Sequence, residues 1–237
     1  MRILLSLIAL CVCFSLELDG QSSLNLGNIN FTGTSSSRTV MYGNNESLEI
    51  SSIEGSPYLM EEFASTNMVL ETDGVSQNAT FITRFNIYSN GFEVEYNGEI
   101  QFLDASAVKT FEYTVGDKQS RFLQAAQFKK AGFDGKGFLQ LLSDGKAKLL
   151  AKEEISIKEV TKREFGKGDE LSRKFYREKT YYINISDEFN EFKSFKESSL
   201  EIFGDKSEQV KDFVKSEKLK FKNEDDIQKA VDFFNGL

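Results

Sequence analysis

Apolar and polar side chains alternate in several short stretches between residues 54 and 157. In residues 92–96, aromatic and aliphatic side chains occupy the even positions and glutamates the odd ones. A period of two puts the two sets on opposite faces of a β-strand, so this pattern predicts a strand with one apolar and one solvated face. Residues 111–115 follow the same rule. Residues 81–88 are apolar at positions on both faces, which predicts a strand covered on both sides for part of its length.

Dipeptides that favour tight turns separate these stretches. Asn-Gly and Asp-Gly tolerate positive φ at both central positions of a two-residue hairpin turn. No helical segment interrupts the region, whereas parallel strands would need helical crossovers. The pattern therefore predicts an antiparallel meander. The dipeptides are Asp73-Gly74, Asn90-Gly91, Asn97-Gly98, Asp134-Gly135 and Asp144-Gly145.

The strand pattern continues into the second half of the chain. Residues 138–142 form a dense apolar run, and apolar residues at odd positions of 147–157 predict a long strand. Residues 180–185 predict a further strand, followed by a turn and a short return strand at 189–195. Residues 121–128 fit neither the strand period nor the helix period, so both assignments stay open there.

From Ser198 onward the apolar period becomes helical. Ser198 with Glu201 forms a capping-box pattern, and Asp205 begins a similar one. Asn223 precedes three acidic residues, which favour the positive end of a helix dipole. The apolar stripes are narrow and need another surface to cover them, so they predict short docked helices. The stripes are Val210, Phe213 and Val214, and Ile227, Val231 and Phe234.

Together these elements predict an α+β fold. A mainly antiparallel β meander, as a curved sheet or partial barrel, is expected to precede a small C-terminal cap of about three short helices. Residues 47–237 are predicted to form one domain, with the β region at 47–195 and the helical cap at 196–237. Residues 21–46 are rich in Ser, Asn, Gly and Thr, which predicts a poorly ordered lead-in or a loosely attached first strand.

Residues 1–20 have the features of a secretory signal peptide. Arg2 precedes the apolar run 3–16, which is shorter than the roughly 20 residues of a membrane-spanning helix. Cleavage is predicted after Gly20, and cleavage after Ser15 is the alternative. No later apolar run reaches the length of a membrane span, so we expect an exported mature chain without a transmembrane segment.

Two residue types that carry much enzyme chemistry are missing from the predicted mature chain. Both cysteines, Cys11 and Cys13, lie in the signal peptide, and histidine is absent from all 237 residues. We therefore expect no disulfide, no thiolate metal site and no cysteine nucleophile. A Ser-His-Asp triad, histidine metal ligands and the usual base near neutral pH are excluded as well.

The charge is acidic and unevenly distributed. The net charge is −8, and residues 1–120 carry 5 Lys and Arg against 15 Asp and Glu. Residues 121–237 carry 24 against 22. Phosphate binding needs a basic surface, so nucleic acid is not expected as a partner. We interpret the asymmetry as a solvated surface that differs between two regions, with an acidic docking face as the alternative.

Paired carboxylates, as used in glycoside hydrolysis, are the remaining candidate catalytic groups. Glu93 and Glu95 share one strand face and could converge on a cleft, but the wet face of a half-exposed sheet explains them more simply. The other pairs are Glu61 with Glu62 and Glu153 with Glu154.

Three further features carry no site. Asp225 and Asp226 lack the Asp-x-Asp-x-Asp-Gly loop of a calcium site. The glycines at 132, 135 and 137 lack the strand–turn–helix setting of a phosphate cradle. Tyr58, beside the only proline, is expected to be a packed corner aromatic. We therefore assign no catalytic, cofactor-binding or metal-binding residue.

Three stretches carry a resemblance to a known family. Residues 54–58 are Glu-Gly-Ser-Pro-Tyr and are followed by Glu-Glu-Phe at 61–63. Residues 142–149 form an Asp-Gly-Lys hairpin, and short capped helices flank residues 219–222. From residue 54 to the C-terminus the chain resembles an uncharacterised secreted protein family common in Bacteroidetes. The resemblance implies export to the periplasm or the outside, and the family brings no established activity.

These observations predict an exported, non-catalytic envelope or secreted binding module. Phe and Tyr make up 30 of the 237 residues, which is enough for an aromatic surface that recognises a lipid, glycan or peptide. The alternative is a carboxylate-based hydrolase acting on envelope polysaccharide. Two carboxylates about 5–10 Å apart in a deep cleft would favour the hydrolase, and a shallow apolar concavity would favour binding.

Overall fold

The computed structural model describes residues 31–34, 39–42, 46–72, 74–128, 135–162 and 170–237. Within these residues, eleven strands form one open antiparallel sheet in the order β1-β7-β6-β5-β4-β8-β9-β10-β11-β12-β13, and β2 and β3 form a separate hairpin. The predicted α+β fold with a mainly antiparallel meander is therefore confirmed. The strands of the first half are β1 Phe31–Thr34, β2 Thr39–Tyr42, β3 Glu46–Glu49, β4 Ala64–Thr72, β5 Val75–Asn86, β6 Gly91–Tyr96, β7 Glu99–Asp104, β8 Val108–Val115 and β9 Lys118–Gln124.

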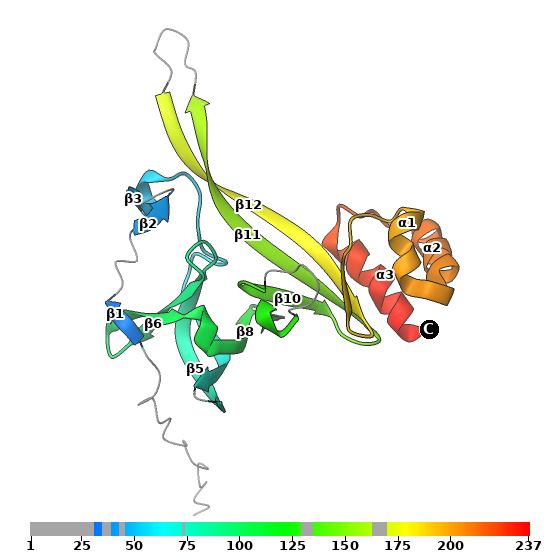
Figure 1. The fold of residues 1–237 in the computed structure, drawn as a ribbon, viewed down its shortest axis with the longest axis horizontal. Helices are drawn as coiled ribbons and strands as arrows, with labels where there is room; N and C mark the ends of the chain where they lie inside the picture. The colour runs from blue at the N-terminus through cyan, green and yellow to red at the C-terminus, as the bar shows by residue number, and fades with distance from the viewer. Residues whose placement is uncertain (1–30, 35–38, 43–45, 73, 129–134, 163–169) are drawn as a thin grey trace, which may run out of the picture.

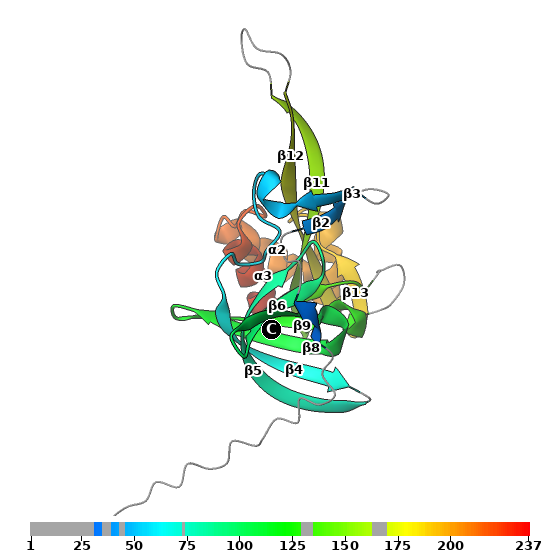
Figure 2. The ribbon, with the colours of Figure 1, turned by 90° about the vertical axis from the view of Figure 1, so that its left-hand side faces the viewer.

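The sheet is strongly curved (Figure 2). Phenylalanine rings form much of the core that it encloses. The ring of Phe92 in β6 lies 5.7 Å from that of Phe138 in β10, Phe138–Ser143, between their centroids. Four strands separate β6 from β10 in the sheet order, which in a flat sheet would hold them roughly 24 Å apart. The rings can meet only because the sheet bends back on itself, as the predicted curved sheet requires. Phe85 and Phe111 complete the contact between the two sides.

A long hairpin leads away from this core (Figure 1). Strands β11, Ala147–Lys162, and β12, Glu170–Ile185, pair along their whole length from Ala147↔Ile185 to Lys162↔Glu170. One face of its outer half is covered by the β2–β3 hairpin and the short 3-10 helix Ile50–Ser52, with Leu48, Ile53 and Phe175 buried between them. Segment 21–46, expected to be a lead-in or a loose strand, thus contributes β1, β2 and the first residue of β3.

The C-terminal α-helices pack on the other end of the hairpin (Figure 1). They share one buried cluster with β11 and β12, to which Leu149, Ile183, Val210 and Phe234 belong. The predicted helical cap is therefore confirmed. Its elements are α1 Glu197–Leu200, the 3-10 helix Glu201–Lys206, α2 Ser207–Ser216 and α3 Glu224–Gly236.

Local signals at the helix starts were only partly correct. Asn223 caps α3, where its side chain accepts a hydrogen bond from the Asp225 amide. Ser198 and Asp205 were wrong as caps, because Lys196 precedes α1 and Lys206 precedes α2, neither with a side-chain cap bond. Neither helix therefore begins at a side-chain cap.

Several strand boundaries also differ from the prediction. Residues 121–128, left open above, divide into the end of β9 and a 3-10 helix, Ala125–Phe128. Residues 180–185 are only the last part of β12, and the return strand β13 is limited to Glu188–Glu191.

Among the described residues, no helix has the length and apolar character needed to cross a membrane. The predicted signal peptide lies outside the described residues.

Candidate functional site

A cavity of about 240 Å³ lies between the curled sheet and the hairpin strand β11. Its walls come from segments far apart in the chain: the loop before β4, strands β5, β9, β10 and β11, and the turn after β5. The apolar wall consists of Leu59, Phe85, Ile87, Phe122, Phe138, Ala151 and Ile155. The polar lining consists of Asn90, Lys136, Gln140, Lys152, Glu153 and Glu154, and Tyr88 and Gly137 complete it.

The loop around Pro57 supplies the cavity with Leu59. The Leu59 amide donates to the Phe85 carbonyl at 2.9 Å, and the Ile87 amide donates to the Pro57 carbonyl at 2.9 Å. Proline has no amide hydrogen to donate, but its carbonyl can still accept, so Pro57 fits at the edge of β5. The segment around the only proline is therefore also the one that holds Leu59 beside the cavity.

A buried cluster of charge lies behind this loop. The Glu93 carboxylate accepts hydrogen bonds from Arg84 Nε and from the Tyr58 hydroxyl, each at 2.7 Å. The Arg84 guanidinium carbon also lies 3.9 Å from the centre of the Tyr58 ring and 4.7 Å from that of Phe63. Burial, and then the hydrogen bond to Glu93, raise the pKa of Tyr58 above its usual range. Tyr58 therefore keeps its proton and donates a hydrogen bond to Glu93, and the prediction of a packed corner aromatic is confirmed.

The interpretation of Glu93 as part of a wet strand face was wrong. Glu93 is only 1% exposed, whereas Glu95 is exposed as expected. The loop that carries Tyr58 and Phe63 covers the Glu93 side of β6 at this position, while the phenylalanine core covers the other side. The two glutamates lie in different surroundings, so they do not form a carboxylate pair at one cleft.

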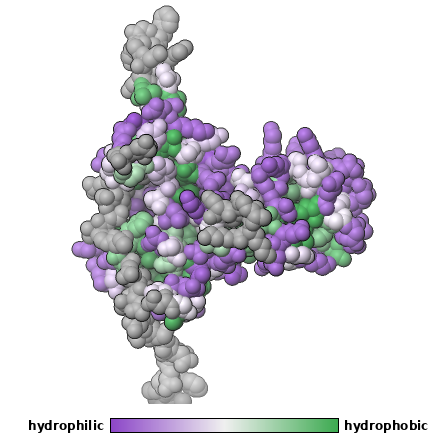
Figure 3. Space-filling model, viewed as in Figure 1, coloured by the Kyte–Doolittle hydropathy of each residue, from purple (hydrophilic) through white to green (hydrophobic). Residues whose placement is uncertain are grey.

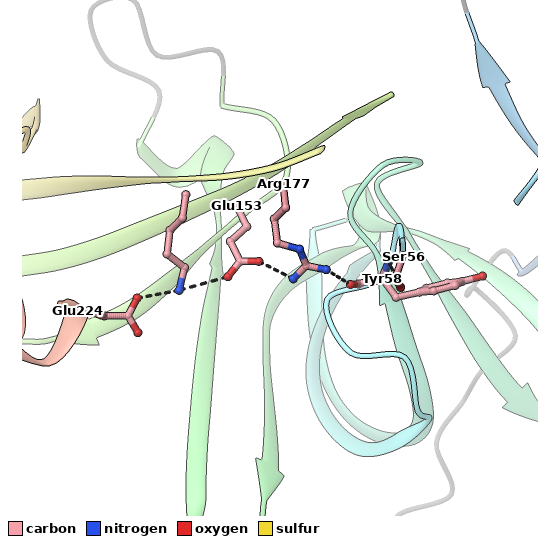
Figure 4. Close-up of polar contacts among 6 residues, drawn as sticks. Ser56, Tyr58, Glu153, Arg177 and Glu224 are labelled. Carbon is pink, nitrogen blue, oxygen red and sulfur yellow. Dashed lines mark hydrogen bonds and ion pairs between the residues drawn. The ribbon is translucent and has the colours of Figure 1, made fainter. Parts of the chain in front are cut away.

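A chain of ion pairs connects this loop to the helical cap (Figure 4). Lys179 donates to Glu224 at the start of α3 at 2.7 Å and lies 3.2 Å from Glu153. Glu153 also pairs with Arg177 at 2.9 Å, and Arg177 donates to the Tyr58 carbonyl. Burial alone would lower the pKa of Lys179, but its contacts with Glu224 and Glu153 outweigh burial and raise that pKa. Glu153 therefore faces two cations.

Another ion pair, between Lys152 and Glu154, lies at the cavity itself. Lys152 is only 6% exposed, and its ammonium lies 3.0 Å from the carboxylate of Glu154, whose side chain is 59% exposed. Lys152 thus carries a positive charge into the wall, and Glu154 and the exposed Lys136 form a polar rim. Both carboxylates that line the cavity have cationic partners.

The remaining candidates from the sequence do not come together. Glu61 and Glu62 are exposed, and it is the Glu61 main-chain carbonyl that accepts from Arg84. Asp226 accepts from the Lys220 amide at the start of α3, far along the chain from the cavity. Within the described residues, no group of three or more Asp, Glu, His or Cys is arranged to hold a metal ion. Of the three glycines, Gly137 lines the cavity, and residue 132 lies outside the described residues.

Sequence reasoning missed four of the six polar residues of the cavity, namely Asn90, Lys136, Gln140 and Lys152. Lys152 follows the apolar run 149–151, and a charged residue directly after a buried run was the available signal. Asn90 was recognised only as a turn residue. It has a φ of 53° and also contributes its side chain to the cavity.

Comparisons of this chain with protein-family models, with curated proteins and with solved structures found no match. The resemblance to a secreted family common in Bacteroidetes therefore stays a prediction.

Proposed function

We propose that this protein is an exported, non-catalytic binding module, and that the cavity beside β11 is its ligand site. The observation that carries the proposal is an apolar recess of about 240 Å³ with a polar rim, built where the curled sheet meets the hairpin. Concave, mainly apolar sites with a few polar groups are the usual form of small-molecule sites.

The cavity sets the size of the group it accepts. Sites for drug-sized ligands span roughly 300–1,000 Å³, so a cavity of about 240 Å³ suits a single bicyclic ring or a short acyl segment. Phe85, Phe122 and Phe138 offer rigid aromatic surface at low entropic cost. On the face seen in Figure 3, hydrophobic surface is divided into patches by hydrophilic surface, which favours a local recess over an extended apolar face.

The charges around the cavity favour binding over hydrolysis. A hydrolase needs one carboxylic acid and one carboxylate placed across a cleft. Here Glu153 lies between Arg177 and Lys179, and Glu154 pairs with Lys152. Both carboxylates therefore already have cationic partners, which suits a structural role better than acid–base catalysis. The hydrolase therefore remains the weaker proposal.

Export rests on the sequence. Arg2 and the apolar run 3–16 support a secretory signal, and the periplasm or the cell exterior is the proposed location. Mass spectrometry of the native protein should find an N-terminus between Leu16 and Gln21. Recovery of the chain with Met1 intact in the cytoplasm would overturn this part of the proposal.

Binding is tested with indene, a neutral bicyclic hydrocarbon, titrated against the mature protein and followed by NMR shifts of backbone amides. We expect saturable shifts at residues that line the cavity. Ala151→Leu replaces a methyl by an isobutyl group in the wall and should abolish the shifts. Ser156→Leu, an exposed position of the same strand outside the lining, is the matched control and should leave them unchanged.

Two outcomes would overturn the proposal. One is that indene causes no saturable shifts in a folded wild-type protein. The other is turnover of envelope glycans or esters by the purified protein that Glu153→Gln or Glu154→Gln abolishes without unfolding it, which would establish the hydrolase instead.

A further inference from the structure

One polar atom of the cavity wall lacks a partner. Among the described residues, the Asn90 side-chain oxygen Oδ1 is buried and makes no hydrogen bond, although Asn90 stands at the surface end of a turn. The neighbouring Asn86 in the same turn behaves in the usual way, because its Oδ1 accepts from the Ser89 amide at 3.0 Å. Native proteins leave few buried acceptors unpaired, because such an atom loses its hydrogen bonds to water and gains none in return.

The position of this oxygen ties it to the cavity. Asn90 and Gly137 both line the cavity, and a Cβ placed on Gly137 would stand 3.7 Å from Asn90 Oδ1. Glycine at 137, with a φ of 75°, thus places no side chain beside the oxygen. An unpaired acceptor next to an apolar recess is the arrangement by which binding sites select ligands that carry a matching donor.

We propose that Asn90 is the polar anchor of the cavity, so that its ligands combine an apolar ring or chain with one N–H or O–H donor aimed at Asn90 Oδ1. This inference rests on the proposed function and narrows it. A hydrocarbon of the same shape would fill the recess but leave the oxygen unpaired. Small aromatic amines, phenols and alcohols of this size are therefore the ligand class.

The test compares three bicyclic probes of nearly equal shape. Indole carries an N–H donor, indene has a methylene at that place, and benzofuran has only an acceptor. One neutral hydrogen bond is worth about 0.5–1.5 kcal/mol, so indole should bind about 3- to 10-fold more tightly than indene. Benzofuran should bind no more tightly than indene, because two acceptors cannot pair.

Two asparagines with the same backbone angle make a matched pair of variants. Asn90 and Asn97 both have a φ of 53°, which glycine adopts without strain. Asn90→Gly should reduce the indole preference to about onefold, and Asn97→Gly, in a turn that does not line the cavity, should leave it unchanged. If Asn90→Gly does not fold, Asn90→Asp, which keeps the acceptor, should retain the preference for indole.

The outcomes separate this inference from the proposed function. Equal affinity for indole and indene overturns the role of Asn90 as an anchor but leaves the proposed binding function intact. Tighter binding of benzofuran than of indole shows that Asn90 presents its amide nitrogen and overturns it too. If the folded Asn90→Gly variant still prefers indole, the indole N–H donates to another residue, and the inference is overturned. No binding of any probe overturns the proposed function itself.

Discussion

The buried ion pair of Arg84 and Glu93 allows a quantitative test of what holds the curled sheet together. Arg84→Met keeps most of the side-chain volume but leaves the Glu93 carboxylate, 1% exposed, without its cation. Removing one partner of a buried pair costs about 3–5 kcal/mol. The Arg84 side chain is 23% exposed, so water can partly replace it, and we expect a loss of about 3 kcal/mol.

The double-mutant cycle distinguishes a coupled pair from two independent contributions. Glu93→Gln keeps the shape and loses the charge, which should cost about 1.5–3 kcal/mol. Arg84→Met combined with Glu93→Gln removes both charges, so its cost should fall well below the sum of the two single variants. Urea unfolding followed by far-UV circular dichroism measures each value, and tyrosine fluorescence replaces the missing tryptophan as a second probe.

Arg121→Met is the matched control, because Arg121 forms a surface pair with Glu112 and its side chain is 51% exposed. Exposed pairs contribute about 0–1 kcal/mol, so this substitution should be nearly silent. The reasoning is refuted if Arg84→Met costs no more than Arg121→Met, or if the costs at positions 84 and 93 simply add.

Three further predictions concern pH, close packing and the helical cap. The raised pKa values of Tyr58 and Lys179 mean that the folded state holds these two protons more tightly than the unfolded state does. Their contribution to stability is therefore present below about pH 10 and is lost as the pH rises above it. In urea unfolding at alkaline pH, the free energy of unfolding should fall by up to about 1.4 kcal/mol per pH unit for each group. Gly91→Ala would place a Cβ 1.9 Å from a phenylalanine ring atom of β7 and should cost about 1–3 kcal/mol in thermal unfolding. Phe234→Ala, at a buried position of α3, should cost about 3–5 kcal/mol, and the half-buried Phe213→Ala should cost about half as much; equal values would contradict the burial.

Much of the fold could be predicted because its local signals agree with its packing. Alternation and turn dipeptides indicated antiparallel strands, and Asn97-Gly98 indeed forms a turn with φ of 53° and 80°. The first half of β12 escaped prediction because its residues 170–179 are mostly charged and polar. They form a strand through pairing with β11, a long-range contact that no local period reveals.

The candidate site was harder to predict, for the same physical reason. Leu59, Phe138 and Ile155 become neighbours only when the sheet curls and the hairpin crosses it. Glu93 has the period of a solvated position, and only the covering loop buries it. The alternation of polar and apolar residues describes a single strand, so it cannot predict that a distant loop covers one face of that strand.

Strand β11 belongs to two buried regions at once. Its residues Ala151 and Ile155 line the cavity, while Ala147 and Leu149, a few residues earlier, pack against the helical cap. Thermodynamic linkage follows from this shared strand, because a ligand that binds only the ordered strand stabilises whatever depends on that order. Amide hydrogen exchange in α3 would then slow when the cavity is filled, although the helix contributes no residue to the cavity lining. Hydrogen exchange in the helical cap would thus report whether the cavity is filled.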